Sequence, residues 1–483
     1  CVFCPNDVRM PKSYLSDEPG CQRAELNGFD PYLQTYQRLR AFSAIGHATD
    51  KAEIIVLGGT FSFYPEAYQV WFIKRCFDAL NDFGRGWDRT ADAEAHRLSL
   101  EAHDARVDGR DLGPGYNKIV ARFLERDAGK DLLRAFEQSS FEELAQAQRD
   151  NETSGCRNVG LVLETRPDYV DEAEVLRLRK LGCTKVQLGY QSLSDEILAK
   201  NKRGHDLAAT RRAMFLLRRA GFKVLAHFMP NLLGATPESD IEDFGRIFDD
   251  PDFRPDELKV YPCSLIESAE LMEHYERGDY RPYEHDEILR VLSHVLVHTP
   301  RYCRLSRVIR DISSGDIVAG NRLSNFREIA EGEARARGAR AVEIRSREVR
   351  GGDVPAERQL KVTRYESRVG EEVFIEYVTA DDRILGFCRL SLPREPRSVF
   401  IEELSGSALL REVHVYGAAL SLGARSSRAA QHSGLGRELI AHAAQLAREA
   451  GFSTLSVISA IGTREYYRQR GFRDGELYQH LAL

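Results

Sequence analysis

Residues 51–60 read Lys-Ala-Glu-Ile-Ile-Val-Leu-Gly-Gly-Thr, a short apolar run that two glycines close. Such a run is typical of a buried strand in a parallel sheet that ends in a tight loop. Similar runs follow at residues 159–163, 185–188, 223–228 and 257–261. Segments with helical periodicity lie between them, at residues 171–180, 194–198 and 207–220. This alternation predicts a parallel α/β barrel or open barrel.

Polar residues stand just after these predicted strands. Glu164, Gln191 and Asn231 each follow an apolar run within a few residues. Barrel enzymes carry their chemistry at the C-terminal ends of the strands, so these positions are candidates for a functional site.

The chain divides into two predicted domains. A barrel over residues 1–314 contains a long, charged, helical insertion at about 84–154, and a basic, glycine-containing linker follows at 315–358. From residue 359 to 483 the pattern changes to strands joined by short turns, followed by a helix at 434–450 and a strand at 454–459. This second pattern predicts a small α+β domain.

Composition narrows the class of protein. The chain has 483 residues, too many for one ordinary core, and no stretch approaches the roughly 20 apolar residues that span a bilayer. Its nine cysteines are odd in number and mostly isolated, which argues against a disulfide framework. The net charge of −6 alone does not indicate a nucleic-acid-binding protein. We expect a cytoplasmic enzyme without a membrane segment.

The loop Gln431-His432-Ser433-Gly434-Leu435-Gly436-Arg437 leads directly into the predicted helix of the second domain. Glycines let backbone amides approach a pyrophosphate closely, and a helix N-terminus favours an anion. With the strand at 411–416 before it and Tyr466-Tyr467 after it, the loop resembles that of the GNAT acetyltransferases. The alternative is an ordinary glycine-capped loop beside a packed tyrosine pair.

The GNAT resemblance implies an acetyl-CoA site. The backbone of Glu412, Val413, His414 and Val415 would pair with the pantetheine arm. Gln431, Gly434, Leu435, Gly436 and Arg437 would surround the pyrophosphate. Tyr467, with Tyr466 beside it, would lie near the thioester and could protonate the leaving thiolate.

The chain opens on Cys1-Val2-Phe3-Cys4-Pro5, two thiols with the spacing of metal ligands. Half of a zinc site or two unpaired thiols are the alternatives. The motif resembles the end of the three-cysteine motif of radical SAM enzymes, which bind a 4Fe-4S cluster whose open iron chelates S-adenosylmethionine (SAM). We expect the third cysteine upstream of this numbering. By the same resemblance, Gly58, Gly59, Thr60, Glu164 and Gln191 would contact SAM.

A radical SAM barrel followed by a GNAT domain resembles the catalytic subunit of Elongator, and in particular its bacterial-type stand-alone form. The shared motifs include Glu164-Thr165-Arg166-Pro167, His227-Phe228-Met229-Pro230-Asn231 and Lys259-Val260-Tyr261-Pro262. The resemblance implies carboxymethylation of the wobble uridine of tRNA. A 5′-deoxyadenosyl radical would take a hydrogen from acetyl-CoA, the carbon radical would add to C5 of uridine 34, and hydrolysis would leave the carboxymethyl group.

The resemblance also assigns further roles. Lys51 would contact acetyl-CoA, and Lys259 would place a buried charge in the radical site, although a strand-end lysine that reaches solvent is an equal alternative. Expected partners are the tRNA anticodon loop, an external electron donor and, as one possible assembly, a second copy of the chain. Basic residues near Arg211, Arg301 and Arg335 would contact RNA phosphates.

Two other functions fit parts of the pattern. One is a protein lysine acetyltransferase in which the barrel is only a scaffold, and it requires neither SAM nor a reductant. The other is a tRNA-binding protein that hydrolyses acetyl-CoA and has lost its cluster.

Overall fold

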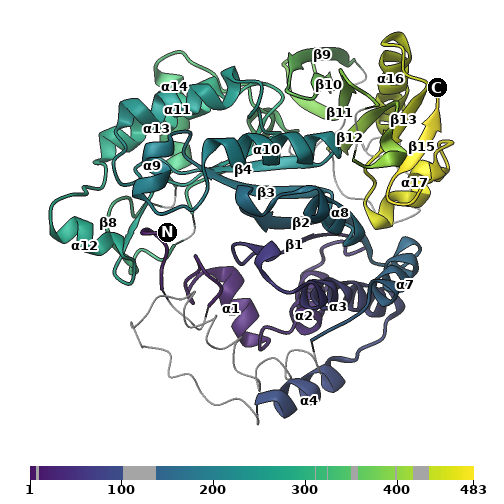
Figure 1. Ribbon diagram of the computed structural model, residues 1–483, viewed down its shortest axis with the longest axis horizontal. Coiled ribbons are helices and arrows are strands. Elements are labelled where there is room, and N and C mark those ends of the chain that lie inside the picture. Colours follow the sequence, from purple (N-terminus) through teal and green to yellow (C-terminus); the bar gives the residue numbers. More distant parts are fainter. Residues whose placement is uncertain are drawn as a thin grey trace.

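The computed structural model describes residues 1–6, 10–101, 137–310, 312–323, 325–349, 357–397, 400–416 and 434–483. Two sheets organise these residues (Figure 1). The first is built from the N-terminal two thirds of the chain and the second from the C-terminal third, as the sequence predicts. The limits of the insertion and of the linker stay predictions.

Six parallel strands form the first sheet, in the order β1-β2-β3-β4-β5-β7. Their bounds are β1 Lys51–Ile55, β2 Arg157–Thr165, β3 Lys185–Gln191, β4 Lys223–Phe228, β5 Glu257–Val260 and β7 Arg304–Val308. The strands occupy neighbouring places in chain order, and the sheet is a partial barrel whose edges are β1 and β7. Five of the strands match the predicted apolar runs, whereas β7 was not predicted.

Helices cover the outer face of this sheet. They are α8 Glu172–Lys180, α9 Asp195–Lys200, α10 Leu207–Arg219, α11 Pro237–Asp249 and α13 His285–His298. Several begin at a side-chain cap: Asp171, Ser194 and Asp206 each accept a hydrogen bond from an amide in the first turn. Such a cap contributes about 1 kcal/mol to helix stability. The helix boundaries therefore follow from local sequence.

A second group of helices lies beside β1 (Figure 1). It comprises α1 Pro19–Leu26, α2 Pro31–Ala44, α3 Glu66–Arg85, α4 Thr90–Glu101 and α7 Phe141–Glu152, with the short 3-10 helices η1 Phe61–Phe63 and η2 Pro167–Tyr169 near the strand ends. Helix α2 packs on α3, and α3 packs on α7 and β2. The described part of the predicted insertion is helical.

Short elements complete the fold. β6 Leu265–Ile266 and α12 Leu271–Glu276 follow β5 within the barrel, whereas β8 Ile317–Ala319, α14 Phe326–Ala336 and α15 Ile344–Arg347 stand between the two sheets in the chain. The segment after β7 returns to the barrel, because the amide of Ile344 donates to the carbonyl of Cys303.

Seven strands form the second sheet, in the order β14-β15-β13-β12-β11-β10-β9. Their bounds are β9 Gln359–Glu366, β10 Gly370–Val378, β11 Ile384–Pro393, β12 Ser407–Val415, β13 Thr454–Val457, β14 Arg473–Asp474 and β15 Gln479–Ala482. Helix α16 Leu435–Glu449 packs across this sheet, with η3 Glu402–Leu404, η5 Ile461–Thr463 and α17 Arg464–Arg468 at its margins.

Two expectations from composition can be compared with the structure. All nine cysteines are free thiols, so the absence of a disulfide framework is confirmed. Within the described ranges, no helix has both the length and the apolar character to cross a bilayer.

Candidate functional site

Cys1 and Cys4 lie in one tight turn beside the end of β3. The amide of Cys4 donates to the carbonyl of Cys1 at 3.2 Å. Nη1 of Arg203 donates to Sγ of Cys1 at 3.2 Å, and Sγ of Cys4 lies 3.2 Å from Oγ of Ser13. Among the residues that the structure describes, no third ligand completes a metal-binding group. The turn therefore supplies two thiols.

Gln191 and Arg203 form a polar wall next to this turn. Gln191 has a φ of 67°, a conformation that is uncommon for a residue other than glycine. Oε1 of Gln191 and Nε of Arg203 are buried, and neither has a hydrogen-bond partner in the described structure. A Cβ at Gly189 would lie 2.8 Å from Nε2 of Gln191. Unpaired buried acceptors and donors beside Cys1 fit the amino-acid group of SAM.

The loop Gly58-Gly59-Thr60 lies against the segment that follows Cys4. Gly58 and Gly59 have φ of 142° and 85°, which residues with a Cβ rarely adopt. A Cβ at Gly59 would lie 3.0 Å from the carbonyl oxygen of Lys12. The two glycines thus allow close contact between this strand-end loop and the cysteine segment.

Inside the barrel, five polar side chains gather above the strand ends. Nζ of Lys259 donates to Oε1 of Gln187 at 2.6 Å, and Nε2 of His227 donates to the same oxygen at 2.9 Å. Oη of Tyr14 donates to Oε2 of Glu164 at 3.4 Å. Lys259 is therefore engaged inside the barrel and is not a lysine extended into solvent.

Burial controls protonation in this cluster. It raises the pKa of Glu164, an effect that the Lys259 charge opposes. It lowers the pKa of Lys259, and it lowers the pKa of His227 well below its usual range, with Lys259 adding to that effect. His227 is consequently neutral at pH 7 and can donate only through the nitrogen that faces Gln187.

Sequence reasoning assigned no role to Tyr14, Gln187, Arg203 or His227. Strand alternation alone could not place Gln187 beside Gln191, because the pairing of β3 with β4 shifts register between Gly189 and Gln191. All four residues depend on contacts between distant segments.

In the second domain, β12 separates from β13 halfway along its length. Residues 407–410 pair with 454–457, whereas residues 412–415 pair only with β11. The other backbone edge of Glu412, Val413, His414 and Val415 therefore has no strand partner in the described structure. Such an edge fits an extended amide-containing chain like the pantetheine arm.

The side chains of this strand have other contacts. Nε of Arg389 donates to Oε2 of Glu412 at 2.8 Å, so Glu412 faces the domain junction. His414 stacks on Phe387 with ring centroids 5.5 Å apart, and burial lowers its pKa. His414 is nevertheless exposed, so a ligand on the free edge of β12 can meet this side chain as well as the backbone.

Helix α16 begins beside the tyrosine pair. Gly434, with a φ of 83°, precedes its first residue, Leu435, which is buried, and Arg437 lies in the same turn. A Cβ at Gly436 would lie 2.4 Å from Oη of Tyr466. Gln431 lies outside the described residues.

The two tyrosines differ in environment. Tyr467 is buried in the core of the second domain, and burial raises the pKa of its hydroxyl. Tyr466 is less buried, and its hydroxyl lies over the first turn of α16, with Arg470 3.3 Å from its ring centroid. The rings meet edge to face at 5.3 Å. Both hydroxyls are protonated at neutral pH.

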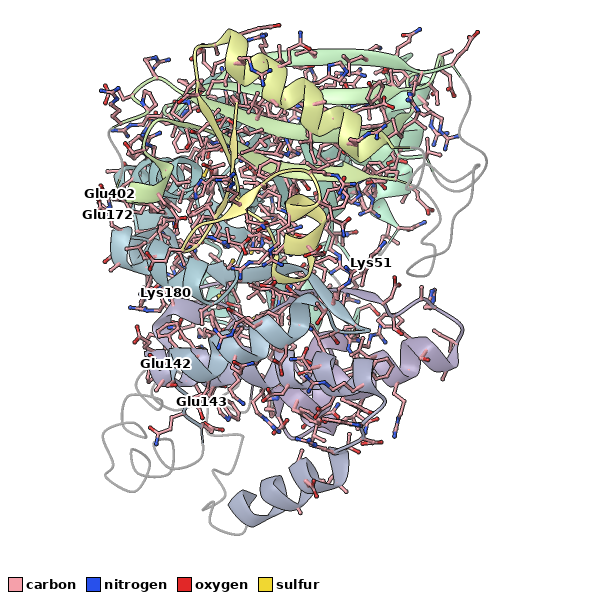
Figure 2. The ribbon with its side chains drawn as sticks, turned by 90° about the vertical axis from the view of Figure 1, so that its right-hand side faces the viewer. Lys51, Glu142, Glu143, Glu172, Lys180 and Glu402 are labelled. Atoms are coloured by element: carbon pink, nitrogen blue, oxygen red, sulfur yellow. The ribbon has the colours of Figure 1, made fainter. Side chains whose placement is uncertain are left out.

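A cavity of about 820 Å³ runs along β1, between that strand and helices α1 and α2. We call it the β1 cavity. Its wall includes Lys51 at one end of β1, Gly58 and Gly59 at the other, and Lys259 from the opposite side. Lys51 lies between the second sheet and the N-terminal helices (Figure 2). The cavity therefore extends from the Gly58-Gly59-Thr60 loop to Lys51, the end of β1 that lies toward the second sheet.

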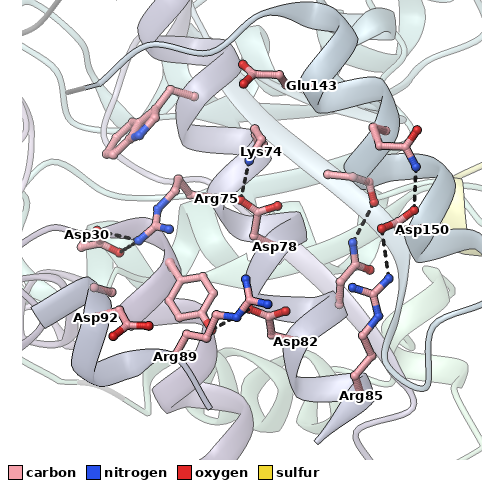
Figure 3. A pocket seen from close by; sticks show the side chains of 16 residues that line it. Asp30, Lys74, Arg75, Asp78, Asp82, Arg85, Arg89, Asp92, Glu143 and Asp150 are labelled. Atoms are coloured by element: carbon pink, nitrogen blue, oxygen red, sulfur yellow. Dashed lines mark hydrogen bonds and ion pairs between the residues drawn. The ribbon is translucent and has the colours of Figure 1, made fainter. Parts of the chain in front are cut away.

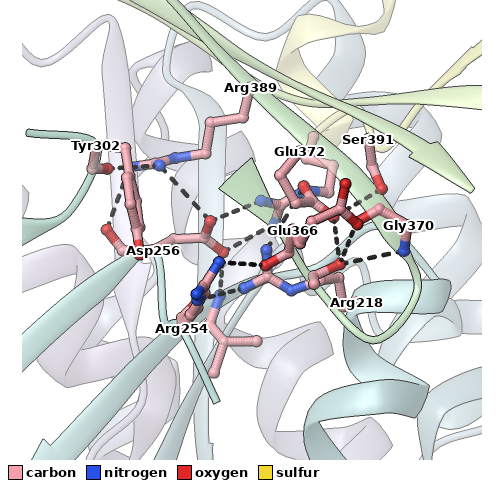
Figure 4. A network of polar contacts seen from close by, with 12 residues as sticks. Arg218, Arg254, Asp256, Tyr302, Glu366, Gly370, Glu372, Arg389 and Ser391 are labelled. Carbon is pink, nitrogen blue, oxygen red and sulfur yellow. Dashed lines mark hydrogen bonds and ion pairs between the residues drawn. The ribbon is translucent and has the colours of Figure 1, made fainter. Parts of the chain in front are cut away.

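A buried ion network joins the two domains (Figure 4). Asp256, which precedes β5, accepts hydrogen bonds from Nη1 and Nη2 of Arg411 at 2.8 and 2.6 Å. Arg411 also donates to Glu372 at 3.1 Å, and Arg389 donates to the carbonyl of Asp256 at 3.2 Å. Burial disfavours the charged Asp256, but the three arginines Arg411, Arg218 and Arg389 together hold its pKa far below the usual range.

A second hollow, of about 560 Å³, lies between α2, α3 and α7 (Figure 3). Its charged side chains pair with one another. Arg75 binds Asp30 at 3.2 Å, and Lys74 binds Asp78 at 2.8 Å. Such mutually paired groups offer little to a ligand, so we assign no site here.

Two of the three basic regions predicted to contact RNA are ion-paired. Arg211 binds Asp250 and Asp252 at 2.6 and 2.5 Å. Arg301 binds Asp382 at 2.6 Å and also pairs with Glu376. Each of these two guanidinium groups therefore has carboxylate partners in the folded chain, and the contacts of the three basic regions with RNA phosphates stay predictions.

Comparison with protein families identifies both domains. The Radical SAM superfamily matches residues 1–246, the Radical_SAM C-terminal domain matches 255–336, and the Acetyltransferase (GNAT) family matches 339–472. The chain is thus a radical SAM protein with a GNAT domain. These families imply a 4Fe-4S cluster, SAM and acetyl-CoA as cofactors, and the buried polar atoms beside Cys1 and the free edge of β12 fit the two organic ones.

Relatives specify the family further. The chain is 36% identical to a tRNA uridine(34) acetyltransferase of Methanocaldococcus infernus over 98% of its length and 80% of the relative. It is 32% identical to Elongator complex protein 3 of Bos taurus, over 98% of its length and 78% of that protein. The chain belongs to this family of tRNA uridine(34) acetyltransferases and Elongator catalytic subunits.

A solved structure agrees with this assignment. The archaeal Elp3 of Methanocaldococcus infernus with an N-terminal deletion superimposes with a TM-score of 0.76 and 34% identity. The match covers 96% of this chain and 97% of that one. The predicted fold, a partial radical SAM barrel followed by a GNAT domain, is therefore confirmed.

Proposed function

We propose that this chain places a carboxymethyl group on C5 of uridine 34 in tRNA, with SAM and acetyl-CoA as co-substrates. The proposal is supported by the names of relatives that match nearly the whole chain. The observation that carries it is the β1 cavity, whose wall includes both the Gly58-Gly59 loop and Lys51. One product that requires both domains explains this connection.

In the barrel, the cluster and SAM would supply hydrogen-atom abstraction when bound. Cys1 and Cys4 would provide two thiolate ligands. The backbone of Gly58, Gly59 and Thr60 would hold the methionine amino group, and Glu164 and Gln191 would meet the ribose and the carboxylate. Lys259, held by Gln187, would place a positive charge beside the reacting base.

In the second domain, the free edge of Glu412 to Val415 would pair with pantetheine. Gln431, Gly434, Leu435, Gly436 and Arg437 would bind the pyrophosphate, and Lys51 would reach acetyl-CoA from the barrel side. Tyr467, with Tyr466 beside it, would donate a proton to the leaving thiolate, since the raised pKa values keep both hydroxyls protonated.

The test uses the full chain, reconstituted without oxygen, with SAM, a reductant, acetyl-CoA and unmodified tRNA. Mass spectrometry of the nucleosides is expected to detect 5-carboxymethyluridine together with 5′-deoxyadenosine. Absence of both products would overturn the proposal. Acetylation of a lysine peptide without SAM would instead favour the protein acetyltransferase, which the relatives do not support.

Two variants separate the domains. Cys4→Ser is expected to abolish 5′-deoxyadenosine formation while acetyl-CoA binding persists. Tyr467→Phe is expected to slow thioester hydrolysis while SAM binding persists. Loss of both activities in either variant would contradict the assigned roles.

Several expectations belong to the same proposal. An external donor would supply the electron, the tRNA anticodon loop would be the partner, and a homodimer is one possible assembly. A cytoplasmic location fits a substrate that is tRNA.

A further inference from the structure

The inward face of β1 is unusually open. Lys51, Glu53, Ile55 and Leu57 alternate along the strand and its extension, and all four are exposed to the β1 cavity. Ile55 and Leu57 are 47% and 44% exposed. In a closed barrel such positions are packed by side chains from neighbouring strands. A concave site with exposed apolar side chains indicates that a ligand covers them.

The opposite wall carries aromatic and cationic groups. Helix α2 contributes Arg38 and Phe42, and the guanidinium carbon of Arg38 lies 4.0 Å from the ring centroid of Phe42. His47 meets the same ring edge to face at 5.6 Å. Proteins stack unpaired nucleobases on such aromatic and guanidinium planes.

Arg23 of α1 completes this wall. Arg23 and Arg38 both line the β1 cavity, and the charge of Arg38 adds to the effect of burial in lowering the pKa of Arg23. Neither forms an ion pair with a described residue, whereas Arg75 on neighbouring α3 binds Asp30. Two adjacent guanidinium groups without a carboxylate suit a phosphate, which accepts several charge-assisted hydrogen bonds.

We propose that the β1 cavity receives the target nucleotide of the RNA loop, entering between β1 and helices α1 and α2. Arg23 and Arg38 bind the phosphate on its 5′ or 3′ side, Phe42 stacks on a base, and Ile55 with Leu57 supports the face of the uracil. This subsite rests on the proposed function. It places the base beside Gly59 and Lys259, which line the same cavity.

The pantetheine arm of acetyl-CoA is the other occupant to consider. Charge favours RNA, because the proposed pyrophosphate site on α16 already meets the phosphates of CoA in the second domain. Arg23 and Arg38 form a second cationic pair away from that site, and they suit a phosphate that does not belong to CoA.

The experiment compares two anticodon stem-loop RNAs that bind the full chain, one with uridine at position 34 and one with an abasic nucleotide there. The wild type is expected to bind the uridine RNA about tenfold more tightly, since stacking of one base contributes about that much. In the variant Phe42→Ala with Leu57→Ala, the ratio should fall to about one. Ile45→Ala, an exposed apolar residue of the same region outside the cavity wall, should keep the wild-type ratio.

Salt dependence tests the phosphate contacts. Arg23→Ala with Arg38→Ala should weaken both RNAs equally and reduce the slope of log K against log salt by about 0.7, the value for one phosphate contact of a single strand. Arg40→Ala, an exposed arginine of α2 outside the cavity wall, is the matched control and should change the slope less. A wild-type slope and ratio in the cavity variants would overturn the subsite.

Photocrosslinking of 4-thiouridine at position 34 to the wild-type chain provides a second measurement that needs no variant. Crosslinked peptides are expected within residues 23–61, and crosslinks confined to other segments would overturn the proposal. Weakened binding of acetyl-CoA alone in the arginine variant would assign the cavity to CoA and also overturn it. Correct crosslinks without 5-carboxymethyluridine would retain the subsite and reject the proposed function.

Discussion

Nη2 of Arg411 lies 2.6 Å from Oδ1 of Asp256, and neither side chain has any exposed surface. Arg411 belongs to β12 of the GNAT domain, and Asp256 immediately precedes β5 of the barrel. This ion pair therefore connects the strand proposed to bind pantetheine with the strand that carries Lys259.

Asp256→Ala is expected to lower the free energy of unfolding by about 3–5 kcal/mol, because it leaves Arg411 buried without its main carboxylate. Urea unfolding of the full chain measures the effect. Glu371→Ala, which breaks the exposed pair with Arg364, is the control and should cost at most about 1 kcal/mol. An unchanged midpoint for Asp256→Ala would show that the junction network does not stabilise the fold.

Asp240 provides a pH-dependent prediction. Its carboxyl accepts from the amide of Asn231 at 2.8 Å and from Oη of Tyr283 at 2.7 Å, and burial raises its pKa to about 7. The folded state therefore holds this proton more tightly than the unfolded state, whose carboxyl titrates near about 4. The stabilisation is complete below that pH and is lost as pH rises to about 7.

Asp240→Asn removes this titration. The variant should gain stability relative to the wild type between pH 5 and pH 8, as measured by thermal unfolding at both pH values. Glu242→Gln on the exposed face of the same helix serves as the control and should show no such trend. A difference independent of pH would mean that Asp240 is charged throughout this range.

Gln191→Ala should weaken SAM binding by about tenfold to a hundredfold, the effect of losing a hydrogen bond to a charged ligand group. Calorimetry with the reconstituted protein measures the dissociation constant, and acetyl-CoA affinity should not change. The exposed Gln146→Ala is the control. Equal SAM affinity in wild type and variant would remove Gln191 from the site.

Gly436→Ala is expected to weaken acetyl-CoA binding about tenfold, because the added methyl group must displace the hydroxyl of Tyr466. Tyr466→Phe in the same chain should recover part of the affinity by removing that oxygen. Gly332→Ala, in a helix position with nothing within 4 Å, is the control and should leave binding unchanged. Failure of Tyr466→Phe to restore binding would place the clash elsewhere.

The strands could be predicted where a local pattern of apolar residues indicates a buried segment. The runs at residues 159–163 and 223–228, which belong to β2 and β4, are mostly apolar, whereas β3 and β5 mix polar and apolar residues, as in Glu257-Leu258-Lys259-Val260. Their length and their place between predicted helices indicated strands. Strand β7 alternates Arg304 and Ser306 with apolar residues, and its polar face is matched by partners from other segments. Arg304 donates to Glu348 at 2.8 Å, and Ser306 donates to Glu257 at 2.5 Å. These partners of Arg304 and Ser306 are known only from the folded chain, so the sequence did not indicate a strand here.

The same limit applies to the candidate site. The glycine loops and the cysteine pair could be recognised because their chemistry lies in consecutive residues. Basic residues near Arg211 and Arg301 were expected to bind phosphate, but their carboxylate partners come from distant parts of the chain. Conversely, no pattern in the sequence selects Arg23 and Arg38. Whether an arginine has a carboxylate partner depends on residues that only the fold brings near it.

The buried ion network of Asp256, Arg389 and Arg411 ties the two domains together, so neither is suited to being produced without the other. A cut between residues 336 and 359 would leave a barrel in which Asp256 lacks Arg389 and Arg411. In the separated GNAT domain, these two arginines would keep only Glu412 and Glu372 as charged partners. Each half would then carry charged side chains without the partners that balance them in the joined protein. Engineering of this enzyme therefore has to treat the joined pair as its smallest unit.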